Sequence, residues 1–174
     1  MWYVIQVQTG REHGVAELCR KQVAWKEEAV FVPLCKRRKK IKGQRVTVTS
    51  TLFPGYLFFE TKEPEQLFFR LKKIRQLTKL LATGENFTPL SESEEHLLTG
   101  LGGKDHVIEV STGIIEGSDV IITEGPLCEF TGRIKKIDRH KCVAIIEIEM
   151  MGEVREVTLG LEIIEKRPEE VKTC

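Results

Sequence analysis

The sequence predicts an α+β fold in which a mixed domain precedes a small all-β domain. Residues 1–100 alternate short β-rich runs with amphipathic helical stretches, whereas residues 113–167 hold only short β-rich runs separated by turns. Glycines and polar residues over 101–112 indicate a linker between them. We therefore expect domains over 1–100 and 113–167, followed by a charged tail over 168–174.

The N-terminal domain is expected to begin with a strand, a helix and a second strand. Trp2–Gln8 is rich in residues that favour strands, and Thr9–Gly10 interrupts it. Arg11–Lys26 then carries apolar residues along one helical stripe. In the next strand, Ala29–Leu34, Pro33 indicates a sheet edge or a strand end because proline lacks the amide hydrogen of a ladder.

A dense positive charge marks the following segment. Seven of the ten residues from Lys36 to Arg45 are basic, none is acidic, and Gly43 offers a turn. This pattern predicts the tip of a long hairpin. Its charge would attract upstream DNA through the phosphates alone, and a solvated hairpin is the alternative.

The run Ser50–Phe59, STLFPGYLFF, is the most informative part of the chain. Pro54–Gly55 cannot lie inside an ordinary strand, because proline lacks an amide donor and glycine weakens a strand interior. At a strand start, a bulge or an edge, this break would leave Phe53 and Tyr56 projecting where they can touch a partner. Ordinary core packing is the alternative.

The rest of the N-terminal domain is expected to add two strands and two helices. Pro54–Glu60 forms a strand, and Pro64 opens a helix because proline is tolerated in a first turn. A short strand is expected at Leu77–Leu81. Ser91, with a glutamate three residues later, predicts a capping box for a helix that ends near Leu98.

Beyond the linker we expect a strongly bent barrel of short strands. Gly125 forms a tight turn with the proline after it, and Gly132 suits a barrel corner that has no room for a Cβ atom. Several short strands with turns between them in about 60 residues are typical of such a barrel. The expected strands are Asp119–Thr123, Arg133–Asp138, Cys142–Met150, Val154–Leu159 and Glu162–Ile164.

Composition excludes several classes of protein. The five cysteines are odd in number and lack a CxxC pair, and the histidines are scattered, so we expect free thiols in a reducing cytoplasm and no metal or cofactor. No apolar run approaches the roughly 20 residues of a membrane span, and the strand-like start of the chain leads us to expect no secretory signal. No catalytic motif is recognisable. We expect a cytoplasmic, monomeric protein that is not an enzyme.

Charge is divided unevenly between the two halves. Residues 1–100 hold 17 Lys/Arg against 11 Asp/Glu, whereas residues 101–174 hold 10 against 15. Within the acidic half, one basic group stands out and is opposed only by Asp138. This local reversal of sign predicts a phosphate-contacting surface, with a solvated hairpin as the alternative. The group comprises Arg133, Lys135, Lys136, Arg139, His140 and Lys141.

The motifs together resemble the NusG family of transcription elongation factors. They are WYVIQ at 2–6, FVP at 31–33, LFPGYLF at 52–58, PLS at 89–91, and the unit GSDVIITEGP with FTGRI over 117–134, which resembles a KOW motif. The resemblance implies an N-terminal NGN domain, an α/β sandwich with an antiparallel sheet, that docks on the clamp helices of the largest RNA polymerase subunit. It also implies a flexible linker and an SH3-like KOW barrel that recruits other partners.

The resemblance assigns roles to individual residues. It places Phe53, Pro54 and Tyr56 in the docking site for the clamp helices, with Phe58 as a further member unless it faces the core. Docking there would resist clamp opening and favour elongation over pausing. Candidates for contact with the non-template DNA strand or the facing gate loop, with solvated charges as the alternative, are Arg20, Lys21 and Arg75.

One departure from the family pattern indicates a specialised member. Housekeeping members carry an IFGR-type stretch that serves Rho and a ribosomal protein, whereas Met150–Glu153 here reads MMGE. The chain is therefore similar to the operon-specific antiterminators RfaH and LoaP. The basic KOW hairpin favours the LoaP type, in which the barrel binds a structured hairpin of the nascent leader RNA. A barrel that refolds into helices, as in RfaH, is disfavoured by the β-branched run Val143–Ile148.

Two other functions remain open. A general NusG protein would link RNA polymerase to Rho or to the ribosome. A ribosome-associated RNA-binding module would use the KOW domain alone, and would leave Phe53 and Tyr56 unexplained.

Overall fold

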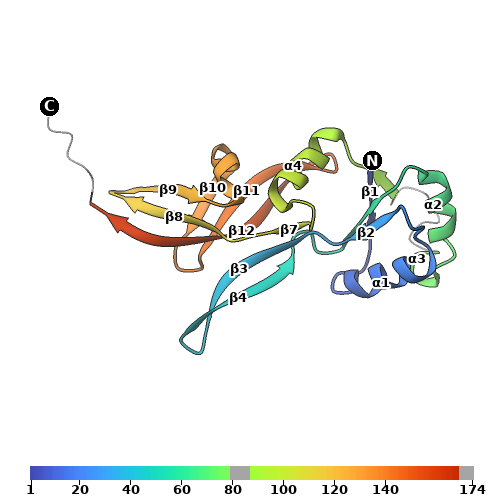
Figure 1. Cartoon of the computed structure of the whole chain (residues 1–174), viewed down its shortest axis with the longest axis horizontal. Helices are drawn as coiled ribbons and strands as arrows, with labels where there is room; N and C mark the ends of the chain where they lie inside the picture. Colours follow the sequence, from blue (N-terminus) through green and yellow to red (C-terminus); the bar gives the residue numbers. More distant parts are fainter. Residues whose placement is uncertain (79–86, 169–174) are drawn as a thin grey trace.

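The computed structural model describes residues 1–78 and 87–168. A mixed α/β domain lies at one end of an elongated molecule and a β-barrel at the other, and a long hairpin projects from between them (Figure 1). The predicted α+β fold is confirmed. None of the helices in the described part of the chain is long and apolar enough to span a bilayer.

The N-terminal domain is built on a four-stranded antiparallel sheet with strand order β2-β5-β1-β6. Alternate residues of its strands face opposite sides. Ile5, Leu57 and Phe59 point into one buried cluster, whereas Val4 and Phe58 point into another. The strands are β1 (Trp2–Gln6), β2 (Ala29–Phe31), β5 (Tyr56–Glu60) and β6 (Phe87–Pro89).

Three helices cover the first face of this sheet. They are α1 (Glu12–Gln22), α2 (Pro64–Leu71) and α3 (Arg75–Thr78), and their buried side chains share a cluster with Leu57 and Phe59. The expectation of a strand from Leu77 is wrong, because fully buried Leu77 packs into that cluster from a helix. Residues 79–81 of the expected strand lie outside the described residues.

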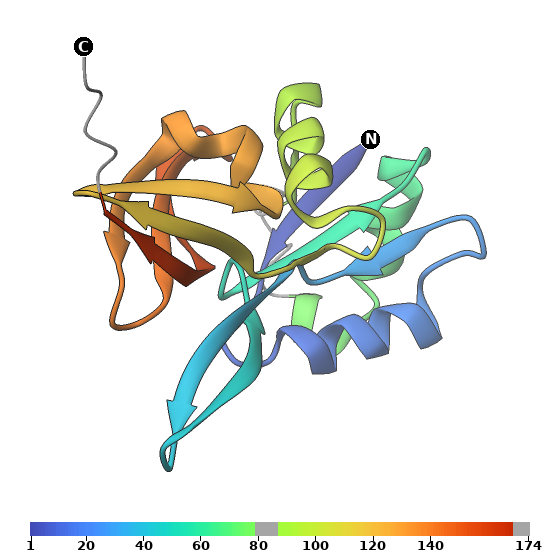
Figure 2. The same ribbon diagram turned by 60° about the vertical axis from the view of Figure 1, so that its left-hand side comes forward.

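The fourth helix, α4 (Glu92–Gly102), lies between the sheet and the barrel (Figure 2). Its capping box is confirmed, since the Ser91 hydroxyl accepts from the Glu94 amide and the Glu94 carboxylate accepts from the Ser91 amide. The helix continues beyond Leu98 because Leu101 is buried with it in one cluster. That cluster extends from β1 through α4 into the barrel.

The predicted basic hairpin is present as β3 (Leu34–Ile41) and β4 (Gln44–Thr51). Lys42 and Gly43 both have positive φ, of 48° and 83°, as a two-residue turn with the twist of the strands requires. β7 (Val107–Ile108) pairs in parallel with the start of β3. The expected linker over 101–112 thus contains the end of α4 and a short strand.

The barrel is a five-stranded sheet with order β10-β11-β12-β8-β9. The last strand in the sequence, β12, is one long element where two short strands, Val154–Leu159 and Glu162–Ile164, were expected. It pairs with β11 up to Gly160 and with β8 from Leu161. The expected strand Arg133–Asp138 is present as β10, except that Arg133 ends a 3₁₀ segment, and fully buried Leu127 packs this segment into the core. The elements are β8 (Ser111–Glu116), β9 (Asp119–Glu124), η1 (Pro126–Arg133), β10 (Ile134–Asp138), β11 (Val143–Met150) and β12 (Glu153–Arg167).

Candidate functional site

The Pro54–Gly55 break forms a tight turn between β4 and β5. Gly55 has a φ of 85°, and its amide donates to a carboxylate oxygen of Glu12 at 2.6 Å. The second oxygen of Glu12 accepts from the Gly10 amide at 2.9 Å. Glu12, buried at the start of α1, therefore fixes the shape of the turn.

Glu12 was not identified from the sequence as a site residue. Burial alone would raise the pKa of its carboxyl, but hydrogen bonds from backbone amides, with Gly55 foremost, outweigh burial and hold the pKa below its usual value. The carboxylate therefore stays ionised at neutral pH. An acidic residue directly after Thr9–Gly10, at a helix start, was the available signal.

The aromatic residues around the turn differ in their accessibility. Phe53 is 4 % exposed and Phe58 is fully buried, so the expectation that Phe53 projects outward is wrong for this arrangement. The two rings pack with centroids 5.9 Å apart in the cluster that continues into the barrel. Tyr56 is partly exposed and Pro54 is exposed.

A side chain of the barrel, that of Arg155, covers the ring of Tyr56. The Arg155 guanidinium lies over the Tyr56 ring, 5.0 Å from its centroid, and donates to the Tyr56 hydroxyl at 3.1 Å. In the preceding turn, the Met151 amide donates to Glu94 of α4 at 2.5 Å. The Met150–Glu153 stretch, read in the sequence as a departure from the family pattern, thus contacts the N-terminal domain. In this arrangement the face predicted to dock on a partner and the barrel turn cover each other.

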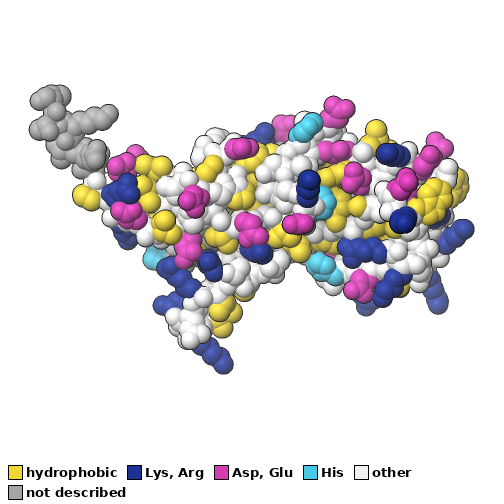
Figure 3. All heavy atoms as spheres, in the orientation of Figure 1, with side chains coloured by type: hydrophobic (Ala, Val, Ile, Leu, Met, Phe, Trp, Pro, Cys, Tyr) yellow, Lys and Arg dark blue, Asp and Glu magenta, His cyan; other side chains and the backbone are white. Residues whose placement is uncertain are grey.

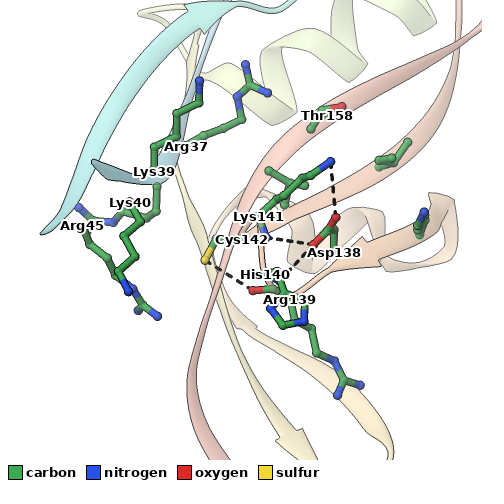
Figure 4. A pocket seen from close by; sticks show the side chains of 14 residues that line it. Arg37, Lys39, Lys40, Arg45, Asp138, Arg139, His140, Lys141, Cys142 and Thr158 are labelled. Atoms are coloured by element: carbon green, nitrogen blue, oxygen red, sulfur yellow. Dashed lines mark hydrogen bonds and ion pairs between the residues drawn. The ribbon is translucent and has the colours of Figure 1, made fainter. Parts of the chain in front are cut away.

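A basic cleft of about 800 Å³ separates the β3–β4 hairpin from the turn between β10 and β11 (Figure 4). In the space-filling view, Lys and Arg side chains gather on the hairpin and on the barrel beside it (Figure 3). Asp138 is the only acid among the described residues that line the cleft. The hairpin contributes Arg37, Arg38, Lys39, Lys40 and Arg45, and the barrel contributes Lys136, Arg139, His140 and Lys141.

Asp138 shapes the barrel side of the cleft. One of its oxygens accepts from the backbone amides of His140 and Lys141, at 3.1 and 2.9 Å. The Lys141 amide is the main cause that lowers the pKa of the Asp138 carboxyl. Since the carboxylate is engaged by the backbone, it organises the turn, and the side chains of Arg139, His140 and Lys141 remain exposed.

The hairpin is fixed against the barrel by specific contacts with β12. Glu162 accepts from Arg38 at 3.3 Å through one oxygen and from Arg45 at 2.9 Å through the other. Gly160 lies so close to β3 that a Cβ atom there would sit 2.5 Å from the backbone oxygen of Lys36. The cleft therefore exists only while the two domains are packed together.

Comparison with known proteins identifies the family. The profile described as "Transcription termination factor nusG" matches residues 1–99, more than half of the chain. The chain belongs to the NusG family. Members of this family act with RNA polymerase in transcription and are transcription factors, not enzymes.

Curated NusG relatives match almost the whole chain. A "Transcription termination/antitermination protein NusG" from Rickettsia felis is 23 % identical over 171 residues, covering 95 % of this chain and 89 % of the relative. The protein of that name from Thermus thermophilus is 24 % identical, covering 95 % and 97 %. That from Lactococcus lactis is 29 % identical, covering 94 % and 91 %.

The structure of this NusG-family chain divides the predicted basic group of the barrel. Lys135 points away from the cleft, between Glu147 at 2.8 Å and Glu156 at 2.7 Å, and these hydrogen bonds raise the pKa of its ammonium. Arg133, at the end of η1, lines a different hollow that also holds Glu94. Neither residue lines the cleft with Lys136. Lys135 faces the opposite side of β10, as neighbouring residues of a strand do, and Arg133 belongs to η1.

The other predicted contacts of the NusG family lie on the helices. Arg20 of α1 donates through Nε to the Val30 carbonyl at 2.9 Å, and so ties α1 to β2. Lys21 is exposed beside Glu17, 3.9 Å away, and Arg75 is exposed at the start of α3. None of the three lines the cleft.

Proposed function

We propose that this NusG-family protein is a specialised antitermination factor of the LoaP type. Its NGN domain docks on the clamp helices of RNA polymerase, and its KOW barrel binds a structured hairpin of the nascent leader RNA. The basic cleft carries this proposal. The barrel, whose overall charge is negative, contributes four basic or imidazole side chains to this cleft, those of Lys136, Arg139, His140 and Lys141. Phosphates are the ligands that such a surface attracts.

The packing of the MMGE stretch supports the specialised function over the general one. In a general NusG protein, this part of the barrel would be free to bind Rho or a ribosomal protein. Here Met150 is fully buried, and the amide of Met151 is bonded to Glu94. The general function is the second candidate, and the names of the relatives, which combine termination with antitermination, favour it.

Docking on the polymerase uses the aromatic face beside the Pro54–Gly55 turn. Phe53 and Phe58 supply a rigid apolar floor, and Tyr56 and Pro54 supply the accessible surface. Arg155 must leave Tyr56 before a clamp helix can contact the ring, so the barrel moves away on docking. A helix held on this face resists clamp opening and favours continued elongation.

Replacing Tyr56 with alanine is expected to weaken binding to a clamp-helix fragment of RNA polymerase by about tenfold, because aromatic residues at interface centres dominate binding energy. Isothermal titration calorimetry measures this, and circular dichroism checks the fold. Phe69→Ala is the matched control, since Phe69 is 67 % exposed on α2 and lies outside the cluster under Tyr56. Equal affinity of Tyr56→Ala and the intact protein would remove the docking assignment.

Two neighbouring lysines provide a matched test of RNA binding. Lys136→Gln is expected to lower affinity for an RNA hairpin and to reduce the slope of log K against log salt by about 1, as the loss of one phosphate contact should. Lys135→Gln makes the same change of charge one residue away and should leave the slope unaltered, because Lys135 is held by Glu147 and Glu156. Filter binding over a range of salt concentrations measures both, and equal behaviour of the two variants would contradict the assignment.

A further inference from the structure

We propose that the β3–β4 hairpin of the N-terminal domain is the second wall of the RNA site, so that both domains together bind an RNA duplex. This inference rests on the proposed RNA-binding function of the barrel and extends it to a site that neither domain holds alone. The sequence presents two separate basic segments, and the structure places them on opposite sides of one cleft (Figure 4).

The charge of the cleft is the first argument. Its described lining holds eight Lys or Arg side chains and a single carboxylate, that of Asp138. Like charges that face one another across a cleft repel, and a bound polyanion relieves that repulsion.

The state of the individual cations is the second argument. Glu162 holds Arg38 and Arg45 and so fixes the hairpin against the barrel. Lys39 and Lys40 are exposed, and no acceptor among the described residues binds either ammonium. The hairpin therefore has cations that position it and further cations that are available to phosphates.

The chemistry of the lining indicates a duplex as the occupant. Sites for single strands stack successive bases on aromatic side chains, and the only ring among the described lining residues is the imidazole of His140. A-form RNA is recognised chiefly by its shape, through phosphates and 2′-hydroxyls. Two cationic β-turns on either side of a cleft suit such a backbone, and the barrel wall is already the proposed contact with RNA.

The test compares three charge-matched variants of the full chain. Lys39→Glu/Lys40→Glu changes the hairpin wall, and Lys136→Glu/Lys141→Glu changes the barrel wall. Lys62→Glu/Lys73→Glu is the control, because both lysines are exposed and neither lines the cleft. The probe is an RNA hairpin with a stem of about 16 base pairs, the length that double-stranded RNA-binding domains span. Affinity is measured over a range of salt concentrations, with circular dichroism as a check on folding.

We expect each cleft variant to lower RNA affinity by at least about tenfold and to reduce the salt slope by about 2, and the control to do neither. Loss of binding in the barrel variant alone, with the hairpin variant equal to the control, would overturn the composite site and leave the proposed function standing. Equal binding by all three variants would overturn both. Equal affinity for a DNA duplex of the same sequence would overturn the assignment of RNA as the occupant.

Discussion

Replacing Gly160 with alanine is expected to separate the two domains. A Cβ atom at this position would lie 2.5 Å from the Lys36 backbone oxygen and 3.2 Å from Cα of Arg37. Backbone atoms of a paired strand cannot give way as a flexible side chain would, so β12 must move off β3. The substitution changes no charge, and none of the three atoms nearest to the added methyl group belongs to β11, the strand that pairs with Gly160.

Separation has opposite consequences for the two proposed ligands. An open arrangement that lies a few kcal/mol above the packed one is populated at about 1 %, so a variant that is always open should bind clamp helices about 100-fold more tightly. The same variant loses the hairpin wall of the cleft, and its affinity for hairpin RNA should fall about tenfold. Calorimetric titrations measure both affinities, and small-angle X-ray scattering measures the increase in the radius of gyration.

Gly132→Ala is the control for this experiment. A methyl group at Gly132 would meet no heavy atom within 4 Å, and the residue has no positive φ, so an alanine fits without displacing a neighbour. The expectation that Gly132 marks a barrel corner without room for a Cβ atom is therefore wrong, because the residue lies in the exposed part of η1. If Gly160→Ala matched this control in scattering and in both affinities, the packing of β12 on β3 would not govern access to either site.

The sequence was sufficient for features that local chemistry determines. The hairpin follows from the basic run with Gly43 at its turn, and the positive φ of that glycine agrees. The capping box at Ser91 follows from the spacing of two residues. The break at Pro54–Gly55 follows from proline and glycine chemistry alone. Each of these depends on residues within a few positions of one another.

Features that depend on contacts between distant parts of the chain could not be predicted from the sequence. Phe53 is buried because its cluster continues across the boundary between the domains, which no sequence window reveals. Lys135 and Lys136 are equivalent in composition, but the strand directs one to Glu147 and the other to the cleft. The convergence of the hairpin with the barrel turn required the packing of β3 on β12.

RNA and the polymerase clamp helices are expected to bind antagonistically. The composite cleft needs β12 packed on β3, whereas docking needs Arg155, on the same strand, to leave Tyr56. One movement of the barrel therefore exposes one site and dismantles the other. By linkage, each ligand must lower the affinity for the other by the same factor, about tenfold for a coupling of ordinary size.

The measurement is a titration of the clamp-helix fragment with and without saturating hairpin RNA. In the intact chain the RNA should raise the dissociation constant for the fragment, and in Gly160→Ala it should have no effect, because that variant has no packed arrangement to stabilise. The antagonism would be refuted if RNA left the affinity of the intact chain for the fragment unchanged or increased it.

The predicted order of events is that the closed protein first binds the leader RNA. Docking on the polymerase then opens the chain and releases the hairpin wall from the RNA. Binding of RNA by the closed form would thus bring the factor to the transcript of its own target and delay its docking until a polymerase is within reach.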